Sequence, residues 1–205
     1  MKNIFFDLDG TLTDPKQGIS LSIIHALRGL NLPSPAPDDL DWVIGPSLLD
    51  SFAKLNVPDP TRALALYRER YASAGLYENS VYSGIPKALA ALKARGYRLF
   101  VATAKPHVYA QKITAKFDLA QYFDAEYGPE LDGTRNNKGE LLEQALAVEN
   151  IDPKTSVMIG DRLLDFKAAA FVGMPSVGVS WGYGDKGELA QADFLCDKRS
   201  DLPEL

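Results

Sequence analysis

Short, uninterrupted runs of apolar residues recur along the chain. They cover residues 4–6, 99–102, 157–159 and 176–179, and a weaker run covers residues 123–127. Such runs are typical of strands that are buried on both faces of a parallel sheet. We therefore predict a strand at each run, and an edge strand that ends at Cys196.

Helical patterns lie between these runs. Apolar residues recur at helical spacing over residues 85–92, 141–146 and 166–170. Gly96 and Gly173 follow two of these segments, and glycine often marks the end of a helix. Strands that alternate with helices predict an α/β fold, a Rossmann-like parallel sheet with helices on both faces.

The segment 15–81 interrupts this alternation. It carries helical stripes, such as Ile19, Ile23 and Leu27, and no convincing strand. We expect its aromatic residues, including Tyr67 and Tyr71, to pack within it rather than to stack on a substrate. The sequence thus predicts an α/β core formed by residues 1–14 and 82–205, and a small inserted α-helical domain formed by residues 15–81.

Composition and charge narrow the class of partner. The chain has 205 residues, 27 of them acidic and 22 basic, and its net charge of -5 gives no general attraction to nucleic-acid polymers or to anionic membranes. The first apolar run is too short for a signal peptide, and no stretch approaches the ~20 apolar residues of a membrane span. With a single cysteine as well, we expect a cytoplasmic protein and, by default, a monomer.

Polar side chains suited to chemistry follow three of the predicted strands. They are Asp7 and Asp9, then Thr103, then Asp161 and Asp165. Because ligands of open parallel sheets bind at the carboxyl ends of the strands, we expect these side chains to converge on one edge. Lys138, preceded by Asn137 as a helix cap, opens the helix before the third of these strands and could reach the same edge.

Carboxylates gathered in one pocket repel one another, and their burial adds a desolvation cost. A divalent cation offsets both effects. Oxygen ligands indicate a hard ion, and Mg²⁺ suits phosphate chemistry. The predicted cofactor is therefore Mg²⁺, and the predicted partner is a small-molecule phosphate ester drawn to the ion and to Lys138.

These residues resemble the four ordered motifs of the haloacid dehalogenase-like hydrolase superfamily. The matching segments are Asp7-Leu8-Asp9-Gly10-Thr11, Thr103, Lys138 and Gly160-Asp161-Arg162-Leu163-Leu164-Asp165. The match spans the chain, and four motifs in order are far more specific than one alone. The insert is similar in position to a helical cap between the first and second motifs, as in phosphoglycolate phosphatase-like proteins.

The resemblance implies a Mg²⁺-dependent phosphatase that works through an aspartyl-phosphate. Asp7 would attack phosphorus, and Asp9 would protonate the leaving oxygen and then deprotonate the hydrolytic water. The carboxylate of Asp7, the backbone carbonyl of Asp9 and the Asp161 side chain would hold the metal, with Asp165 as a direct or water-mediated ligand.

Phosphate binding is the second role that the resemblance implies. Thr103 and Lys138 would contact phosphate oxygens, together with the backbone N–H groups of Leu8, Asp9 and Ala104.

Other cationic residues have more than one interpretation. Lys105 either binds substrate or is a solvated loop residue. Lys112 and Lys116 are alternatives to Lys138, and for Arg162 we favour a structural salt bridge over contact with substrate.

Five other functions fit part of the pattern. A 5'-nucleotidase acts on the same kind of bond, and a sugar phosphomutase would use the same motifs with a sugar hydroxyl as the acceptor. Asp9 argues against carbon–halogen cleavage, because a halide leaves without protonation. Phosphonate cleavage needs an activated lysine from the insert, for which Lys16 and Lys54 are candidates. A non-catalytic binding module is least favoured, because no motif residue is missing.

Overall fold

A six-stranded parallel sheet forms the centre of the α/β core in the computed structural model, which describes residues 2–204. The strand order is β5-β4-β1-β6-β7-β8, and every registered pair is parallel. The strands are β1 (Asn3–Phe6), β4 (Arg98–Ala102), β5 (Ala125–Tyr127), β6 (Ser156–Gly160), β7 (Ser176–Val179) and β8 (Phe194–Cys196). All the predicted strands are present, including the edge strand that ends at Cys196.

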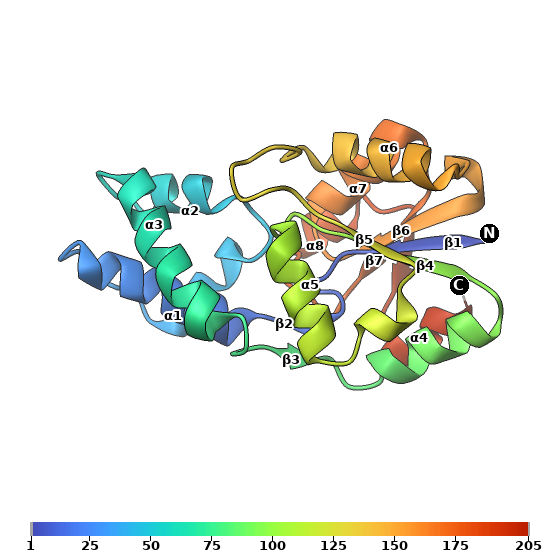
Figure 1. Ribbon diagram of the computed structural model, residues 1–205, viewed down its shortest axis with the longest axis horizontal. Helices are drawn as coiled ribbons and strands as arrows, with labels where there is room; N and C mark the ends of the chain where they lie inside the picture. Colours follow the sequence, from blue (N-terminus) through green and yellow to red (C-terminus); the bar gives the residue numbers. More distant parts are fainter. Residues whose placement is uncertain (1, 205) are drawn as a thin grey trace. The chain divides into compact units, whose positions relative to one another are not determined.

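Helices cover both faces of this sheet. The main ones are α4 (Ile85–Ala94), α5 (His107–Lys116), α6 (Lys138–Glu149) and α7 (Leu163–Val172). Figure 1 shows α6 and α7 on one face, and α4 and α5 on the other. Shorter elements are η3 (Ala120–Tyr122), η4 (Pro153–Thr155), α8 (Lys186–Leu189) and η5 (Arg199–Glu204). The predicted α/β fold is confirmed.

The apolar strands are buried because both faces of the sheet are covered. On one face Phe5 stacks on Phe100 with ring centroids 4.7 Å apart, and Met158, Leu142 and Ala169 complete a cluster beneath α6 and α7. All five side chains are fully buried. This packing removes large apolar areas from water and fixes the strand ends that carry the polar residues.

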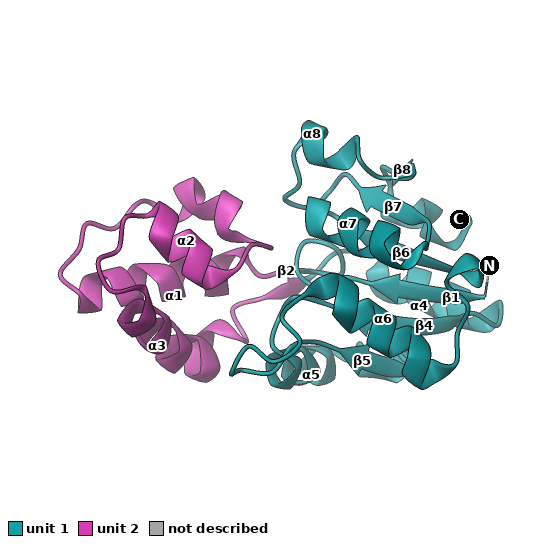
Figure 2. Ribbon diagram, turned by 90° about the horizontal axis from the view of Figure 1, so that it is seen from above, with its two compact units in different colours: residues 1–13, 81–205 teal, residues 14–80 magenta. Residues whose placement is uncertain are grey.

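Contacts divide the chain into two compact units, residues 1–13 with 81–205 and residues 14–80 (Figure 2). The two boundaries between the units, after residues 13 and 80, each lie one residue before the expected position. The second unit contains α1 (Lys16–Gly29), η1 (Pro37–Val43), α2 (Leu48–Lys54), α3 (Pro60–Arg70) and η2 (Tyr71–Gly75). Inside it Tyr67 and Tyr71 are buried and stack at 5.1 Å, so the expectation that they pack is confirmed. The paired strands β2 (Thr13–Asp14) and β3 (Ser80–Val81) carry the two chain crossings.

The order of the strands marks β1 as the point from which successive strands are added first on one side and then on the other. The chain builds β4 and β5 on one side of β1, and then returns to build β6, β7 and β8 on the other side. Open α/β sheets bind ligands in the crevice at the carboxyl ends beside such a switch point. No helix within residues 2–204 combines the length and apolarity that a membrane crossing requires.

Candidate active site

The sheet register aligns the residues that follow the central strands. Phe6 of β1 lies opposite Val101 of β4 and Ile159 of β6. Asp7 is the next residue, and its N–H donates to the Ile159 carbonyl at 2.9 Å. Asp7 therefore emerges level with the ends of both neighbouring strands, at the switch point of the sheet.

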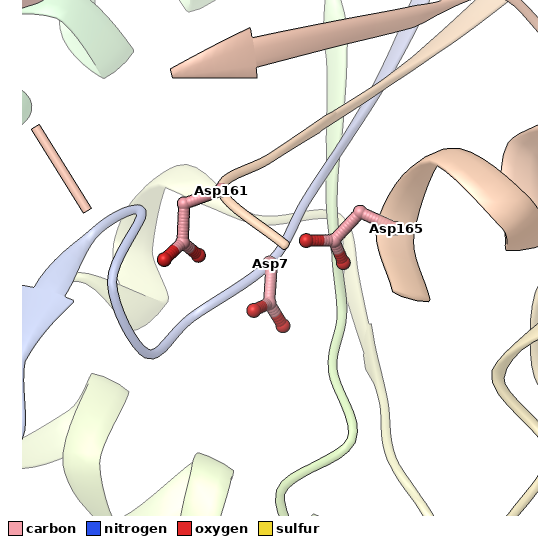
Figure 3. A group of neighbouring side chains, drawn as sticks. All are labelled: Asp7, Asp161 and Asp165. Carbon is pink, nitrogen blue, oxygen red and sulfur yellow. The ribbon is translucent and has the colours of Figure 1, made fainter. Parts of the chain in front are cut away.

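Three buried carboxylates meet there. Asp7, Asp161 and Asp165 each place one carboxylate oxygen within 4.8 Å of the other two. The three carboxyl groups face a common space from β1, the end of β6 and the first turn of α7 (Figure 3). The structure thus brings together three of the four predicted carboxylates.

Lys138 balances part of this charge. Its Nζ lies 2.8 Å from Oδ1 of Asp7 and also contacts Oδ1 of Asp165. Burial by itself lowers the pKa of this lysine, but the Asp165 and Asp7 carboxylates outweigh burial and hold the pKa above its usual value. Asn137 caps α6 as predicted, because its Oδ1 accepts the N–H groups of residues 139 and 140. Lys112 and Lys116 are exposed on α5 and are not the site lysine.

Burial and the charges of neighbouring acids raise the pKa of Asp161 and of Asp165. Desolvation, followed by the charges of Asp165 and Asp7, raises the pKa of Asp161 to about 8, although the Tyr183 N–H donates to Asp161 at 2.7 Å. Burial also raises the pKa of Asp165 against the opposing charge of Lys138. With all three acids ionised, the cluster carries two more negative charges than Lys138 neutralises. An oxygen-only donor set with this excess charge fits a hard divalent cation.

Asp9 is not a member of this cluster. Its Oδ2 lies 2.5 Å from Nζ of Lys105, and both side chains are almost completely buried. Its Oδ1 is buried and has no hydrogen-bond partner among the described residues. Desolvation raises the pKa of Asp9, and Lys105 opposes that shift. The interpretation of Lys105 as a solvated loop residue is therefore wrong.

The predicted phosphate-binding residues lie around the same strand ends. Thr103 directly follows β4, is buried, and accepts the Lys105 N–H with its Oγ1 at 3.2 Å. Leu8, which follows Asp7 after β1, is fully buried. Ala104 is half-buried beside them. Their contacts with phosphate, like that of Lys138, stay predictions.

Sequence reasoning missed a loop that supports Asp161. After β7, the indole N–H of Trp181 donates to the Thr11 carbonyl at 3.0 Å, while the Tyr183 N–H binds Asp161. A Cβ atom at Gly182 would lie 2.4 Å from Oδ2 of Asp161, so only glycine fits there. The signal was present, because a glycine-rich segment follows the fourth apolar run at the same sheet edge.

Three other basic side chains that were candidates for a functional role have different contacts. Arg162 pairs with Glu188 at 2.8 Å, which confirms the expected salt bridge. Lys54 is exposed and lies over the Trp42 ring. Hydrogen bonds to Asp41 and Asp38 raise the pKa of Lys16. A Schiff-base lysine needs a lowered pKa, so Lys16 does not support phosphonate chemistry.

Comparison with known proteins finds relatives over most of the chain. The family model for haloacid dehalogenase-like hydrolases matches residues 4–179. A 5'-nucleotidase of Pseudomonas aeruginosa is 45% identical over 190 residues, which cover 91% of this chain and 86% of that protein. The tyrosine-protein kinase PtkA of Mycobacterium tuberculosis is 38% identical over 198 residues, 96% of this chain and 66% of that protein.

Two further similar proteins are named as phosphatases. A plasmid phosphoglycolate phosphatase of Cupriavidus necator is 31% identical over 211 residues, 98% of this chain and 91% of that protein. The crystal structure of a predicted phosphatase from Clostridium acetobutylicum superimposes with a TM-score of 0.94 at 36% identity, and the match covers 99% of this chain and 96% of that one. As the four motifs predict, the chain belongs to the haloacid dehalogenase-like hydrolase family and is similar to phosphatases within it, a phosphoglycolate phosphatase among them.

Proposed function

We propose that this protein is a Mg²⁺-dependent phosphatase that hydrolyses a small organic phosphomonoester through an aspartyl-phosphate on Asp7. One observation carries the proposal. Asp7 lies at the switch point of the sheet, in a buried cluster with Asp161 and Asp165, and a single lysine contacts both Asp7 and Asp165. This is an arrangement that receives a phosphate dianion and attacks it with a carboxylate.

Asp7 is the nucleophile in this proposal. A carboxylate oxygen of Asp7 forms a bond to phosphorus while the bond between phosphorus and the ester oxygen breaks. Lys138 orients Asp7 through the 2.8 Å contact and screens its charge from the substrate. Thr103 and the N–H groups of Leu8, Asp9 and Ala104 surround the phosphate oxygens.

Asp9 moves the protons. It donates one to the departing ester oxygen and later takes one from the water that attacks the aspartyl-phosphate, which releases inorganic phosphate and restores Asp7. Its place outside the acidic cluster suits this role, because proton transfer requires a carboxyl group that is not held as a metal ligand.

The acids of the cluster would hold the metal. Asp7, Asp161 and Asp165 supply carboxylate oxygens, and Asp9 supplies its backbone carbonyl. When bound, Mg²⁺ neutralises charge on the nucleophile and on the phosphate. Mg²⁺ is favoured because the donors are oxygens and the substrate is a phosphate.

The substrate is drawn from small phosphate esters. The relative named as a 5'-nucleotidase is more similar to this chain than the phosphoglycolate phosphatase of Cupriavidus necator, so a nucleoside 5'-monophosphate comes first and phosphoglycolate second. The α-helical unit, residues 14–80, would act as the cap that selects the leaving group. Action as a cytoplasmic monomer remains part of the proposal.

A phosphate-release assay tests this function. We expect Mg²⁺-dependent turnover of para-nitrophenyl phosphate and of at least one member of a panel of nucleotide, glycolate and sugar phosphates. Asp7→Asn should abolish turnover, while Lys112→Met, on the exposed face of α5, should retain it. Absence of turnover across the panel, or full activity in EDTA, would overturn the proposal.

Phosphoryl transfer to another acceptor is the second candidate, because one relative is named as a tyrosine-protein kinase. The same aspartyl-phosphate would then pass its phosphoryl group to a hydroxyl instead of water. Radiolabelled phosphate donors, followed by separation of free phosphate from labelled acceptors, distinguish the two outcomes.

A further inference from the structure

Lys105 forms a buried ion pair that the acidic cluster does not explain. Its Nζ lies 2.5 Å from Oδ2 of Asp9, with 5% and 12% of the two side chains exposed. Removing two charges from water is costly, and such a pair is maintained only where its geometry is close and fixed. The pair is therefore a specific structural feature rather than a surface contact.

The second oxygen of Asp9 has the opposite environment. Oδ1 is buried and accepts no hydrogen bond among the described residues. Buried polar atoms are usually paired, so an unpaired carboxylate oxygen in an active site needs a reason. Proton exchange with a reacting group is such a reason, because a hydrogen-bond donor already bound to Oδ1 would compete with that group for the oxygen.

The loop that carries Lys105 is fixed by its surroundings. The Lys105 N–H donates to Oγ1 of Thr103, and the N–H of His107 donates to the Pro129 carbonyl at 2.8 Å. A Cβ atom at Gly128 would lie 2.6 Å from the Lys105 carbonyl, which shows how closely the two loops pack. Lys105 thus reaches Asp9 from a rigid base at the end of β4.

We propose that Lys105 is a positioning residue for Asp9, which clamps Oδ2 and so presents Oδ1 to the leaving group. The inference rests on the proposed phosphatase function. When the ester bond breaks, Oδ1 gives its proton to the departing oxygen, and the carboxylate that forms stays paired with Lys105. Oδ1 then takes a proton from the water that attacks phosphorus, which closes the cycle.

The dependence on the leaving group tests this role. Nitrophenolate departs with little help from a proton, whereas the alkoxide that leaves an alkyl phosphate needs one. kcat/KM reports only steps up to phosphoryl transfer and excludes hydrolysis of the aspartyl-phosphate. The ratio of kcat/KM for ethyl phosphate to that for para-nitrophenyl phosphate, measured with Mg²⁺, therefore isolates proton donation.

We expect Lys105→Met to lower this ratio by about 10- to 100-fold, which is the scale of a misplaced catalytic group. Lys105→Arg keeps the charge and should restore part of the ratio, while the exposed control Lys112→Met should leave the ratio unchanged. If Lys105→Met does not fold, as judged by circular dichroism, Lys105→Gln takes its place with the same expectation.

Other outcomes overturn the inference. If Lys105→Met lowered kcat/KM equally for ethyl phosphate and para-nitrophenyl phosphate, Lys105 would be a substrate-binding residue. The same conclusion would follow if the variant raised only KM, and only for further esters whose leaving group is an anion. If wild-type protein turns over both esters and only the ratio fails to change, this inference alone is wrong. Absence of turnover in wild-type protein would remove the proposed function and this inference with it.

Discussion

The two units of the chain bury different kinds of residue. All the buried charged side chains within residues 2–204 belong to the α/β unit: Asp7, Asp9, Lys105, Lys138, Asp161 and Asp165. In the helical unit, by contrast, the buried polar side chains within the described residues are all neutral: those of Ser20, Ser22 and Ser51. Each of these hydroxyls donates to the backbone carbonyl four residues earlier, at 2.7 to 3.0 Å.

This difference separates chemistry from packing. Buried charges cost free energy, and in the α/β unit they converge on one strand edge where a catalytic role can explain them. The helical unit is held by apolar packing and locally satisfied hydroxyls, which many sequences can provide. We therefore expect substitutions in the acidic cluster of the α/β unit to change the reaction, and substitutions in the helical unit to change mainly stability.

The largest expected effect is in the α/β unit. Asp9→Asn keeps the shape of the side chain but removes proton transfer, so turnover of an alkyl phosphate should fall by roughly 10²- to 10⁴-fold while phosphate binding persists. Steady-state kinetics and product inhibition by inorganic phosphate measure the two quantities. Near-normal rates on the alkyl ester would contradict proton transfer by Asp9.

A large effect on stability is expected in the helical unit. Tyr67→Ala removes a buried ring that stacks on Tyr71, and should lower the free energy of unfolding by about 3 kcal/mol. Urea unfolding measures this change. Tyr77→Ala is the control, because Tyr77 is 48% exposed in the same unit and should change stability little. If both substitutions lowered the free energy of unfolding equally, burial would not explain the contribution of Tyr67 to stability.

Metal binding should link stability to pH in the α/β unit. The pKa of Asp161 in the metal-free fold is about 8, above its usual value of 3.8, so its ionisation destabilises the fold increasingly as pH rises from 4 to 8. Mg²⁺ should relieve this cost most at pH 8. At 100 times its Kd it adds about 2.7 kcal/mol, or roughly 5–10 °C in Tm.

Thermal unfolding with EDTA and with Mg²⁺ measures this gain. We expect a smaller increase in Tm at pH 5 than at pH 8, and almost none in Asp161→Asn at either pH. An increase that is the same at both pH values would show that the acidic cluster is not the Mg²⁺ site.

The smallest effect concerns an ion pair of the helical unit. Lys16 is partly exposed and pairs with Asp38 and Asp41, so Lys16→Met should cost less than about 1 kcal/mol in urea unfolding. Phosphate-ester turnover should be retained. Loss of turnover in a folded Lys16→Met variant would show that the helical unit takes part in the chemistry.

The contrast between the units also separates what the sequence could predict from what it could not. Buried parallel strands are continuous apolar runs, so these runs alone identified β1, β4, β6 and β7. Ligands of an open parallel sheet bind at the carboxyl ends of its strands, so Asp7, Asp161 and Asp165 could be assigned to one edge from the sequence. The order of the strands, with β1 between β4 and β6, came only from the structure.

The contacts of Lys105 could not be predicted in this way. From the sequence, a lysine after Thr103 was equally compatible with substrate binding and with solvent, because its flexible side chain can reach several positions. The loop packing beside Gly128 decides that it turns inward to Asp9. The support of Asp161 by the segment around Gly182 was likewise missed, since 21 residues separate the two in the chain.

The secondary-structure elements, the strand edge with the acidic residues and the family could all be inferred from the sequence, because apolar runs and the order of motifs are local features of the chain. The sharing of charge within the site is a property of the folded protein, in which Lys138 contacts Asp7 and Asp165, and Lys105 contacts Asp9. Pairing of buried charges depends on distances of a few ångströms between residues far apart in the chain, and sequence spacing does not encode such distances.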